Sequence, residues 1–237
     1  MPRAFAALAA VVLLAACGPA PLPAHPALWE VRGGEGEVAW LFGTVHALDR
    51  PASWRSPAVD AALDAADIVV VEVRDLEDGA AMAQNFARLA RTPAMPPLSA
   101  RVEPSLRPAL ARLIKQANAS PATFADMETW AAAIVLARAT APEINERHGI
   151  DRAVMRAVKG KPVVELEGAA SQLAIFDHLP EAEQRDMLAL VVRDAQSLVA
   201  EDADLATAWR TGNMAVIEAE TRQGLLADPE LRAALFT

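Results

Sequence analysis

Short apolar runs alternate along this chain with longer segments in which apolar residues recur every three or four positions. The short runs predict strands, and the longer segments predict helices. The first two runs flank a glycine-rich turn at residues 33–36, which predicts a β-hairpin. The run from Ile68 to Val73 is β-branched except at Glu72, as is typical of a strand buried on both faces. The expected strands are Leu28–Val31, Val38–Phe42, Ile68–Val73 and Pro162–Leu166.

The remaining segments carry helix signals. Ser56-Pro57 is a helix start, because proline is favoured at the first helical position. Beyond Gly168 we expect helices alone, with separate ones over Glu181–Val199 and Asp202–Thr211. The other expected helices are 80–91, 105–117, 128–140, 150–159, 169–178 and 213–226. This order predicts an α/β (α+β-like) fold, with a small central sheet formed by the N-terminal hairpin and two core strands, under an extensive helical cover.

The N-terminal residues carry an export signal. A basic start at residues 1–3 precedes the apolar run Ala4–Ala16, which is shorter than the ~20 residues needed to span a bilayer. Leu14-Ala15-Ala16-Cys17 is similar to a bacterial lipobox, whose cysteine is lipidated, and Cys17 is the single cysteine of the chain. The alternative is an ordinary signal peptide from which Cys17 is discarded. We therefore expect a lipoprotein signal peptide over residues 1–17.

The next ten residues are rich in proline, with prolines at positions 19, 21, 23 and 26. Such a stretch is extended and semi-rigid, so we expect a tether over residues 18–27 and a folded domain over 28–237. Gly18 stands where an aspartate would retain a lipoprotein in the inner membrane. The expected location is therefore the outer membrane, facing the periplasm, with the lipid anchor as the contact to the membrane.

Composition removes several classes of function. The chain has 237 residues, a formal net charge of −9 and 53% hydrophobic residues, which is enough for a sizeable core. Its three lysines and acidic balance do not fit binding to the phosphates of a nucleic acid. One cysteine cannot form an internal disulfide, and no Cys/His spacing resembles a zinc site.

Gly43-Thr44-Val45-His46 follows the predicted strand Val38–Phe42 directly. A glycine at a strand end lets the backbone turn and leaves room for a ligand. His46 would then lie at the mouth of the sheet, where imidazole suits a transition metal or acts as a general base. The alternative is a loop histidine satisfied by a backbone carbonyl.

Glu72 is the second candidate, because it lies inside the apolar run Ile68–Val73. A carboxylate there is costly unless it is paired or coordinated. At the carboxyl end of this strand, Glu72 would reach the same rim as His46. The alternatives are a buried ion pair with an arginine such as Arg74, or a strand-end side chain in solvent.

Three further acidic residues are supporting candidates. Glu165 and Glu167 lie at the end of the last predicted strand. Asp151 follows Gly149 at a predicted helix start, where it is a cap or a catalytic group. Among the other histidines, His148 beside Gly149 is the best further candidate.

In order along the chain, these segments resemble the TraB/GumN family. This family is related to the TIKI-type membrane metallopeptidases and more distantly to haem-binding and erythromycin-esterase-like proteins. The resemblance covers Leu28 to about Phe236. The matching segments are Leu28-Trp29-Glu30-Val31, Leu41-Phe42-Gly43-Thr44-Val45-His46, Val71-Glu72-Val73, Gly149-Ile150-Asp151 and Gly160-Lys161-Pro162-Val163 with Leu166-Glu167.

The resemblance implies a metal-dependent hydrolase, most readily a peptidase acting on a peptide or protein. Its site would combine two Gly-x-x-His motifs with a strand glutamate around a divalent transition metal ion. By position, His46 and Glu72 match metal-binding and catalytic residues, and Gly43 belongs to the first motif. Asp151 and Glu167 match recurrent acidic positions.

The second Gly-x-x-His motif of the family is missing, because no glycine after Gly43 is followed three residues later by histidine. We therefore expect an incomplete C-terminus. Two functions remain open: a tethered metal-dependent hydrolase, or a non-catalytic lipoprotein or inactive truncated remnant with a binding or structural role.

Overall fold

The computed structural model describes residues 20–74, 76, 78–140 and 144–221, with residues 194–203 and 221 described by their backbone alone. The predicted signal peptide with Cys17, and the predicted incomplete C-terminus, lie outside these residues. The strands are β1 Leu22–Pro23, β2 Leu28–Arg32, β3 Val38–Phe42, β4 Ala52–Ser53, β5 Val69–Val71 and β6 Val163–Glu165. The helices are α1 Pro57–Ala65, α2 Gly79–Leu89, α3 Arg107–Gln116, α4 Thr129–Thr140, α5 Ile150–Ala157, α6 Ala169–Asp177, α7 Glu181–Thr211 and α8 Met214–Thr221. Short 3-10 turns are η1 Leu98–Ala100, η2 Pro104–Leu106, η3 Pro121–Phe124 and η4 Glu146–His148.

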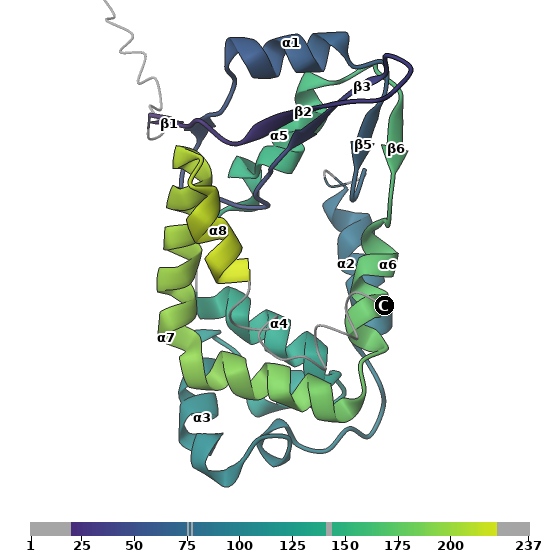
Figure 1. The fold of residues 1–237 in the computed structure, drawn as a ribbon. Coiled ribbons are helices and arrows are strands. Elements are labelled where there is room, and N and C mark those ends of the chain that lie inside the picture. The colour runs from purple at the N-terminus through teal and green to yellow at the C-terminus, as the bar shows by residue number, and fades with distance from the viewer. Residues whose placement is uncertain (1–19, 75, 77, 141–143, 222–237) are drawn as a thin grey trace, which may run out of the picture.

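The fold is a mixed α/β fold, as predicted, with the described strands, α1 and α5 toward one end and α3 and α4 toward the other (Figure 1). The predicted hairpin is confirmed: β2 pairs antiparallel with β3, from Leu28 opposite Phe42 to Arg32 opposite Val38. β5 pairs in parallel with β6, and β1 in parallel with β4. Among the described residues the strands therefore form three two-stranded sheets, where the sequence predicted one small sheet.

The prediction that the strand Ile68–Val73 is buried on both faces is wrong. Val70 pairs with Val164, and these two side chains are 53% and 43% exposed. Their neighbours Val69 and Val163 are half-buried and pack against the core at the strand end of the molecule. β5 and β6 thus bury one face only.

This core at the strand end is built around α5, whose Ile150 and Val154 are buried with Trp54 and Trp209. α1 closes the core on one side. The Ser56 side chain caps α1 by accepting from the Val59 N–H at 3.2 Å. At the C-terminal end of α1, the Lys161 ammonium donates to the backbone carbonyls of Asp64 and Ala66. A cation at this position stabilises the unpaired carbonyls at the end of a helix.

A second core fills the helical end of the molecule, where α4 packs against α7. Trp130 and Leu136 of α4 and Leu188 of α7 are fully buried there. Arg101 is also buried, with 1% of its surface exposed, and it donates to the carbonyls of Pro96, Phe124 and Met127.

α7 connects the two ends of the molecule. It is one helix of 31 residues where the sequence predicted two, and it bends from the helical end toward β1 (Figure 1). Near its C-terminus the Arg210 carbonyl accepts from the His25 N–H at 2.7 Å, and Ala24 is 4% exposed. Residues 22–24 of the predicted tether are therefore packed on the folded part of the chain. None of the described helices is long and apolar enough to cross a bilayer.

Candidate functional site

The backbone of Gly43 fixes the start of the loop that carries His46. Its N–H donates to the Ala27 carbonyl at 3.3 Å, and its carbonyl accepts from the Trp209 indole N–H at 2.8 Å. A Cβ added at Gly43 would meet nothing within 4 Å, so the space beside this residue is open, as the sequence predicted.

Gly149, for which no role was predicted from the sequence, fixes the end of the same loop. A Cβ at Gly149 would lie 2.2 Å from the carbonyl oxygen of His46 and 2.9 Å from that of Glu146. Real Cβ atoms do not approach backbone oxygens so closely. The next residue, Ile150, is 1% exposed and donates its N–H to the Val45 carbonyl at 2.8 Å. Glycine is therefore needed here because α5 begins directly against the loop of His46.

This contact brings together His46 and Asp151, which are 105 positions apart in the sequence. The His46 Nδ1 atom lies 2.5 Å from the Asp151 Oδ2 atom. The His46 side chain is 75% exposed and that of Asp151 is 15% exposed, so a fixed carboxylate holds an open imidazole ring. With Nδ1 engaged, Nε2 is the nitrogen left for a proton or a ligand.

Electrostatics favour a charged pair. The hydrogen bond to Asp151 raises the pKa of His46 above its ordinary value, against the lowering effect of desolvation. The charges of Asp151, Glu72 and Glu146 raise this pKa further. Burial raises the pKa of Asp151, but hydrogen bonds from His46 and Thr44 and the charge of His46 outweigh it, so this pKa is lowered. Both shifts favour imidazolium beside carboxylate.

Glu72 lies one residue beyond β5, and its side chain is exposed. The sequence predicted that burial of this carboxylate would be costly, but Glu72 is exposed and this cost does not arise. Its carboxylate lies 3.4 Å from the Gln172 amide nitrogen, and its charge acts on His46. The structure thus places Glu72 within electrostatic range of the His46–Asp151 pair.

The other acidic candidates on this segment are Glu165, the last residue of β6, and Glu167, two residues beyond it. The Glu165 carboxylate accepts from the N–H of Arg74, two residues beyond Glu72, at 2.7 Å. Glu167 is exposed, and its backbone N–H donates to the Glu72 carbonyl at 3.2 Å. Only the backbone of Glu167 therefore has a described role.

His148 lies in η4, and its Nδ1 atom is 3.3 Å from the Leu48 carbonyl. A backbone carbonyl thus satisfies the His148 ring. The contact joins η4 to the segment after His46.

The profile of the TraB/PrgY/gumN family matches residues 27–237. The chain belongs to this family. It is 30% identical over 145 residues to the uncharacterized protein YbaP of Escherichia coli (strain K12), over 60% of this chain and 52% of YbaP. The YbaP protein of Shigella flexneri matches to the same extent. The chain spans about half the length of the curated relatives it matches, and no solved structure matches it.

The metal ligands that the TraB/PrgY/gumN resemblance implies are incomplete in the part of the chain described. There, no three His, Cys, Asp or Glu side chains gather closely enough to hold a metal ion. His46 and Glu72 offer two donors, and Asp151 already engages one nitrogen of His46. Catalytic zinc sites use three protein ligands, so these residues do not by themselves fit a catalytic metal.

Proposed function

We propose that this chain is an exported, membrane-tethered hydrolase of peptide bonds, with His46 as its general base and Asp151 as the residue that positions it. The observation that supports this proposal is the contact between His46 Nδ1 and Asp151 at the end of β3. An imidazole held by a carboxylate through one nitrogen, with the other nitrogen directed to a substrate, is the arrangement that general base catalysis uses.

The proposed reaction follows from this geometry. Nε2 takes a proton from a water molecule while the water oxygen attacks the carbonyl carbon of the peptide bond. Asp151 stabilises the imidazolium that forms. The imidazolium then returns the proton to the leaving amine, the C–N bond breaks, and a carboxylic acid and an amine are released. The negative charge of Glu72, which also raises the pKa of His46, adds to the stabilisation of the imidazolium.

A divalent transition metal at His46 stays a prediction of the family resemblance. The two donors described do not complete a site, and so the proposed steps use the residues of the chain alone.

The pH dependence of hydrolysis tests this proposal. The base form of His46 is needed, and its pKa is raised, so the rate should rise with pH through a pKa above that of an ordinary histidine. Asp151→Asn should move this limb to lower pH, because the amide does not stabilise the imidazolium. Asp49→Asn is the matched control, since Asp49 pairs with Arg50 on the surface. If the rise of the hydrolysis rate with pH occurs at the same pH in Asp151→Asn as in the wild type, the assignment of His46 as the general base is contradicted.

The second candidate is a non-catalytic lipoprotein with a binding or structural role. The incomplete set of metal donors among the described residues favours it. Under this candidate, a purified protein with its native fold would hydrolyse no peptide at any pH.

A further inference from the structure

The hairpin of β2 and β3 has one face that is both apolar and exposed. Trp29 pairs with Leu41, and Val31 pairs with Ala39. Residues directly opposite each other in an antiparallel pair lie on the same face, so these four side chains form one surface, which we call the hairpin face. Trp29, Val31 and Leu41 are 44%, 47% and 58% exposed, and Ala39 is exposed as well.

The opposite face of the hairpin carries the contacts that the fold uses. Leu28 and Phe42 of this face pack against the core around α5. Glu30 and Arg32, the charged residues of β2, lie on the same side as Leu28 because side chains alternate along a strand, and they form an ion pair. The hairpin face is therefore left without charge and without a contact to the core. An exposed apolar patch of this kind marks a surface that meets a membrane or another protein.

The proposed anchor brings a bilayer close to this part of the molecule. Cys17 would carry the lipid, and Leu22 is the first residue of β1. A fully extended chain covers at most ~3.6 Å per residue, so the steps from position 17 to 22 span about 18 Å or less. β1 itself is fixed to the fold, because the Leu22 N–H donates to the Pro51 carbonyl at 2.9 Å. A lipid at Cys17 would therefore hold the folded part of the chain close to the bilayer.

The hairpin face is within reach of the bilayer under this tether. β1 ends at Pro23 and β2 begins at Leu28, so the hairpin follows the attachment point directly. Another exposed apolar pair, Val70 with Val164, belongs to β5 and β6, which lie across the molecule from β1 (Figure 1). A short tether therefore favours the hairpin face over the outer face of β5 and β6 for contact with lipid.

We propose that the hairpin face docks on the lipid bilayer to which the chain is tethered. The inference rests on the membrane tether of the proposed function. Tryptophan is enriched where membranes meet water, so Trp29 would lie at the level of the headgroups. Leu41 and Val31 would bury their side chains at the boundary of the acyl chains. The tether gives the face a high effective concentration at the bilayer, so a contact that is weak by itself is populated.

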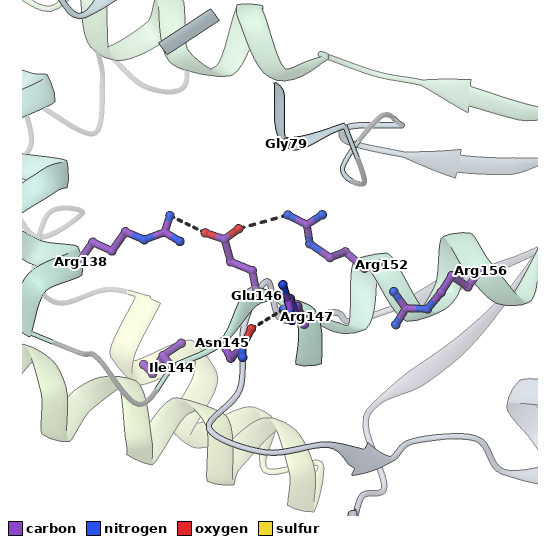
Figure 2. A pocket seen from close by; sticks show the side chains of 8 residues that line it. All are labelled: Gly79, Arg138, Ile144, Asn145, Glu146, Arg147, Arg152 and Arg156. Atoms are coloured by element: carbon purple, nitrogen blue, oxygen red, sulfur yellow. Dashed lines mark hydrogen bonds and ion pairs between the residues drawn. The ribbon is translucent and has the colours of Figure 1, made fainter. Parts of the chain in front are cut away.

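A charged cavity beside α5 lies outside the hairpin face. Its volume is about 420 Å³, and Figure 2 shows the Glu146 carboxylate between the guanidinium groups of Arg138 and Arg152. None of the described residues that line this cavity belongs to β2 or β3. Docking of the hairpin face therefore places none of these charged side chains in the contact with lipid, where a charge would be costly.

Docking would also position the His46 site. β3 ends at Phe42 and leads directly into the loop of His46, so Leu41 and His46 are at most about 18 Å apart along an extended chain. The His46–Asp151 pair would then be held near the membrane surface. Under the proposed hydrolase activity, this makes peptide segments at the membrane surface the accessible substrates.

Quenching of tryptophan fluorescence by brominated lipid tests the inference without any turnover. The protein is expressed as the full chain, purified from the membrane and reconstituted in vesicles of phosphatidylethanolamine and brominated phosphatidylcholine. Trp29→Phe removes the reporter from the hairpin face, and Leu41→Glu places a charge there. Val70→Glu is the matched control, because Val70 is 53% exposed and Leu41 is 58% exposed.

We expect brominated lipid to quench the wild type and Val70→Glu to the same extent. Leu41→Glu should lose this quenching, because a carboxylate disfavours contact with lipid, and Trp29→Phe should lose the part that Trp29 contributes. A lipidated wild type that is not quenched, or quenching that survives in both hairpin variants, would overturn the docking. If Leu41→Glu is unfolded, the comparison of Trp29→Phe with Val70→Glu decides.

Two further measurements separate the remaining outcomes. The mass of the purified protein reports the lipid, and a chain without lipid at Cys17 would overturn the tether and the inference with it. Sedimentation reports the oligomeric state in detergent. A dimer that Leu41→Glu makes monomeric, with no quenching by lipid, would show that a second copy covers the face and would overturn the inference. If quenching is observed but no peptide is hydrolysed, the docking stands and the hydrolase proposal fails.

Discussion

At the scale of single residues, Gly149 explains how two distant segments form one site. The Gly149 position has no room for a side chain, because the carbonyl oxygens of His46 and Glu146 occupy the space where a Cβ would lie. Its φ of −58° and ψ of 139° are open to any L-residue, so crowding alone requires glycine. Close contact at this point places Asp151 against the His46 ring.

The Gly149→Ala variant should therefore lose stability and separate the pair. The added methyl group would push the loop of His46 from α5, at a cost of about 2 kcal/mol in the free energy of unfolding, as for other overpacked sites. Chemical denaturation measures this loss, and the NMR titration of His46 should show its pKa falling toward the ordinary value. Gly43→Ala is the control, since a Cβ there meets nothing. Equal stability of the two variants would contradict the role of Gly149.

The sequence identified part of this site, for physical reasons that differ by residue. The Gly-x-x-His pattern after a strand marked His46, and the apolar run marked Glu72, although Glu72 proved to be exposed. Asp151 was predicted as a helix cap or a catalytic group and as a recurrent acidic position of the family. Its contact with His46 was not predicted, because a contact across 105 positions leaves no local pattern.

At the scale of elements, the sequence predicted where helices begin more reliably than it predicted which faces of the strands are buried. Ser56-Pro57 starts α1 as predicted, because a cap is a local interaction. β5 was expected to be buried on both faces, but burial depends on what packs against a strand, which its own residues do not specify. The sequence predicted separate helices over Glu181–Val199 and Asp202–Thr211, but α7 is continuous, and it contains no glycine or proline that would interrupt it.

Arg101 supports a prediction at this scale. Its guanidinium group joins the segments around η1 and η3 to the start of α4 through buried carbonyls. Burial lowers the pKa of Arg101, which shows how far this charge is removed from water. Arg101→Met should reduce the free energy of unfolding by about 3 kcal/mol, because it leaves these carbonyls without donors.

The matched control for Arg101 is Arg107→Met. The Arg107 guanidinium also donates to a backbone carbonyl, that of Ser99 at 2.9 Å, but in an exposed position. We expect a loss of about 0.5 kcal/mol there, measured by the same denaturation experiment. Similar losses at Arg101 and Arg107 would show that burial of the hydrogen bonds is unimportant.

At the scale of the whole molecule, the chain is a TraB/PrgY/gumN family member with two cores connected by α7. The His46–Asp151 pair lies at the N-terminal end of α5, a helix that belongs to the core at the strand end of the molecule. The proposed anchor at Cys17 would hold this arrangement at a membrane surface, on a short segment before the packed residues 22–24.

Cys17→Ala tests the proposed anchor. Without the thiol no lipid can be attached, so the protein should move from the membrane fraction to the soluble fraction of the cell envelope. Immunoblots of the fractions measure the change, and incorporation of a labelled fatty acid should be lost in the same variant. A protein that stays in the membrane fraction after this substitution would contradict lipidation at Cys17.

The most direct test of the proposed hydrolase is the turnover of a peptide mixture by the purified full chain, followed by mass spectrometry. The wild type, His46→Gln and His148→Gln are compared at equal concentration. His148 is the matched control because a backbone carbonyl satisfies its ring. We predict cleavage by the wild type and by His148→Gln, and a rate at least about a hundredfold lower for His46→Gln. Cleavage that survives in His46→Gln, or no cleavage by the folded wild type, would contradict the account.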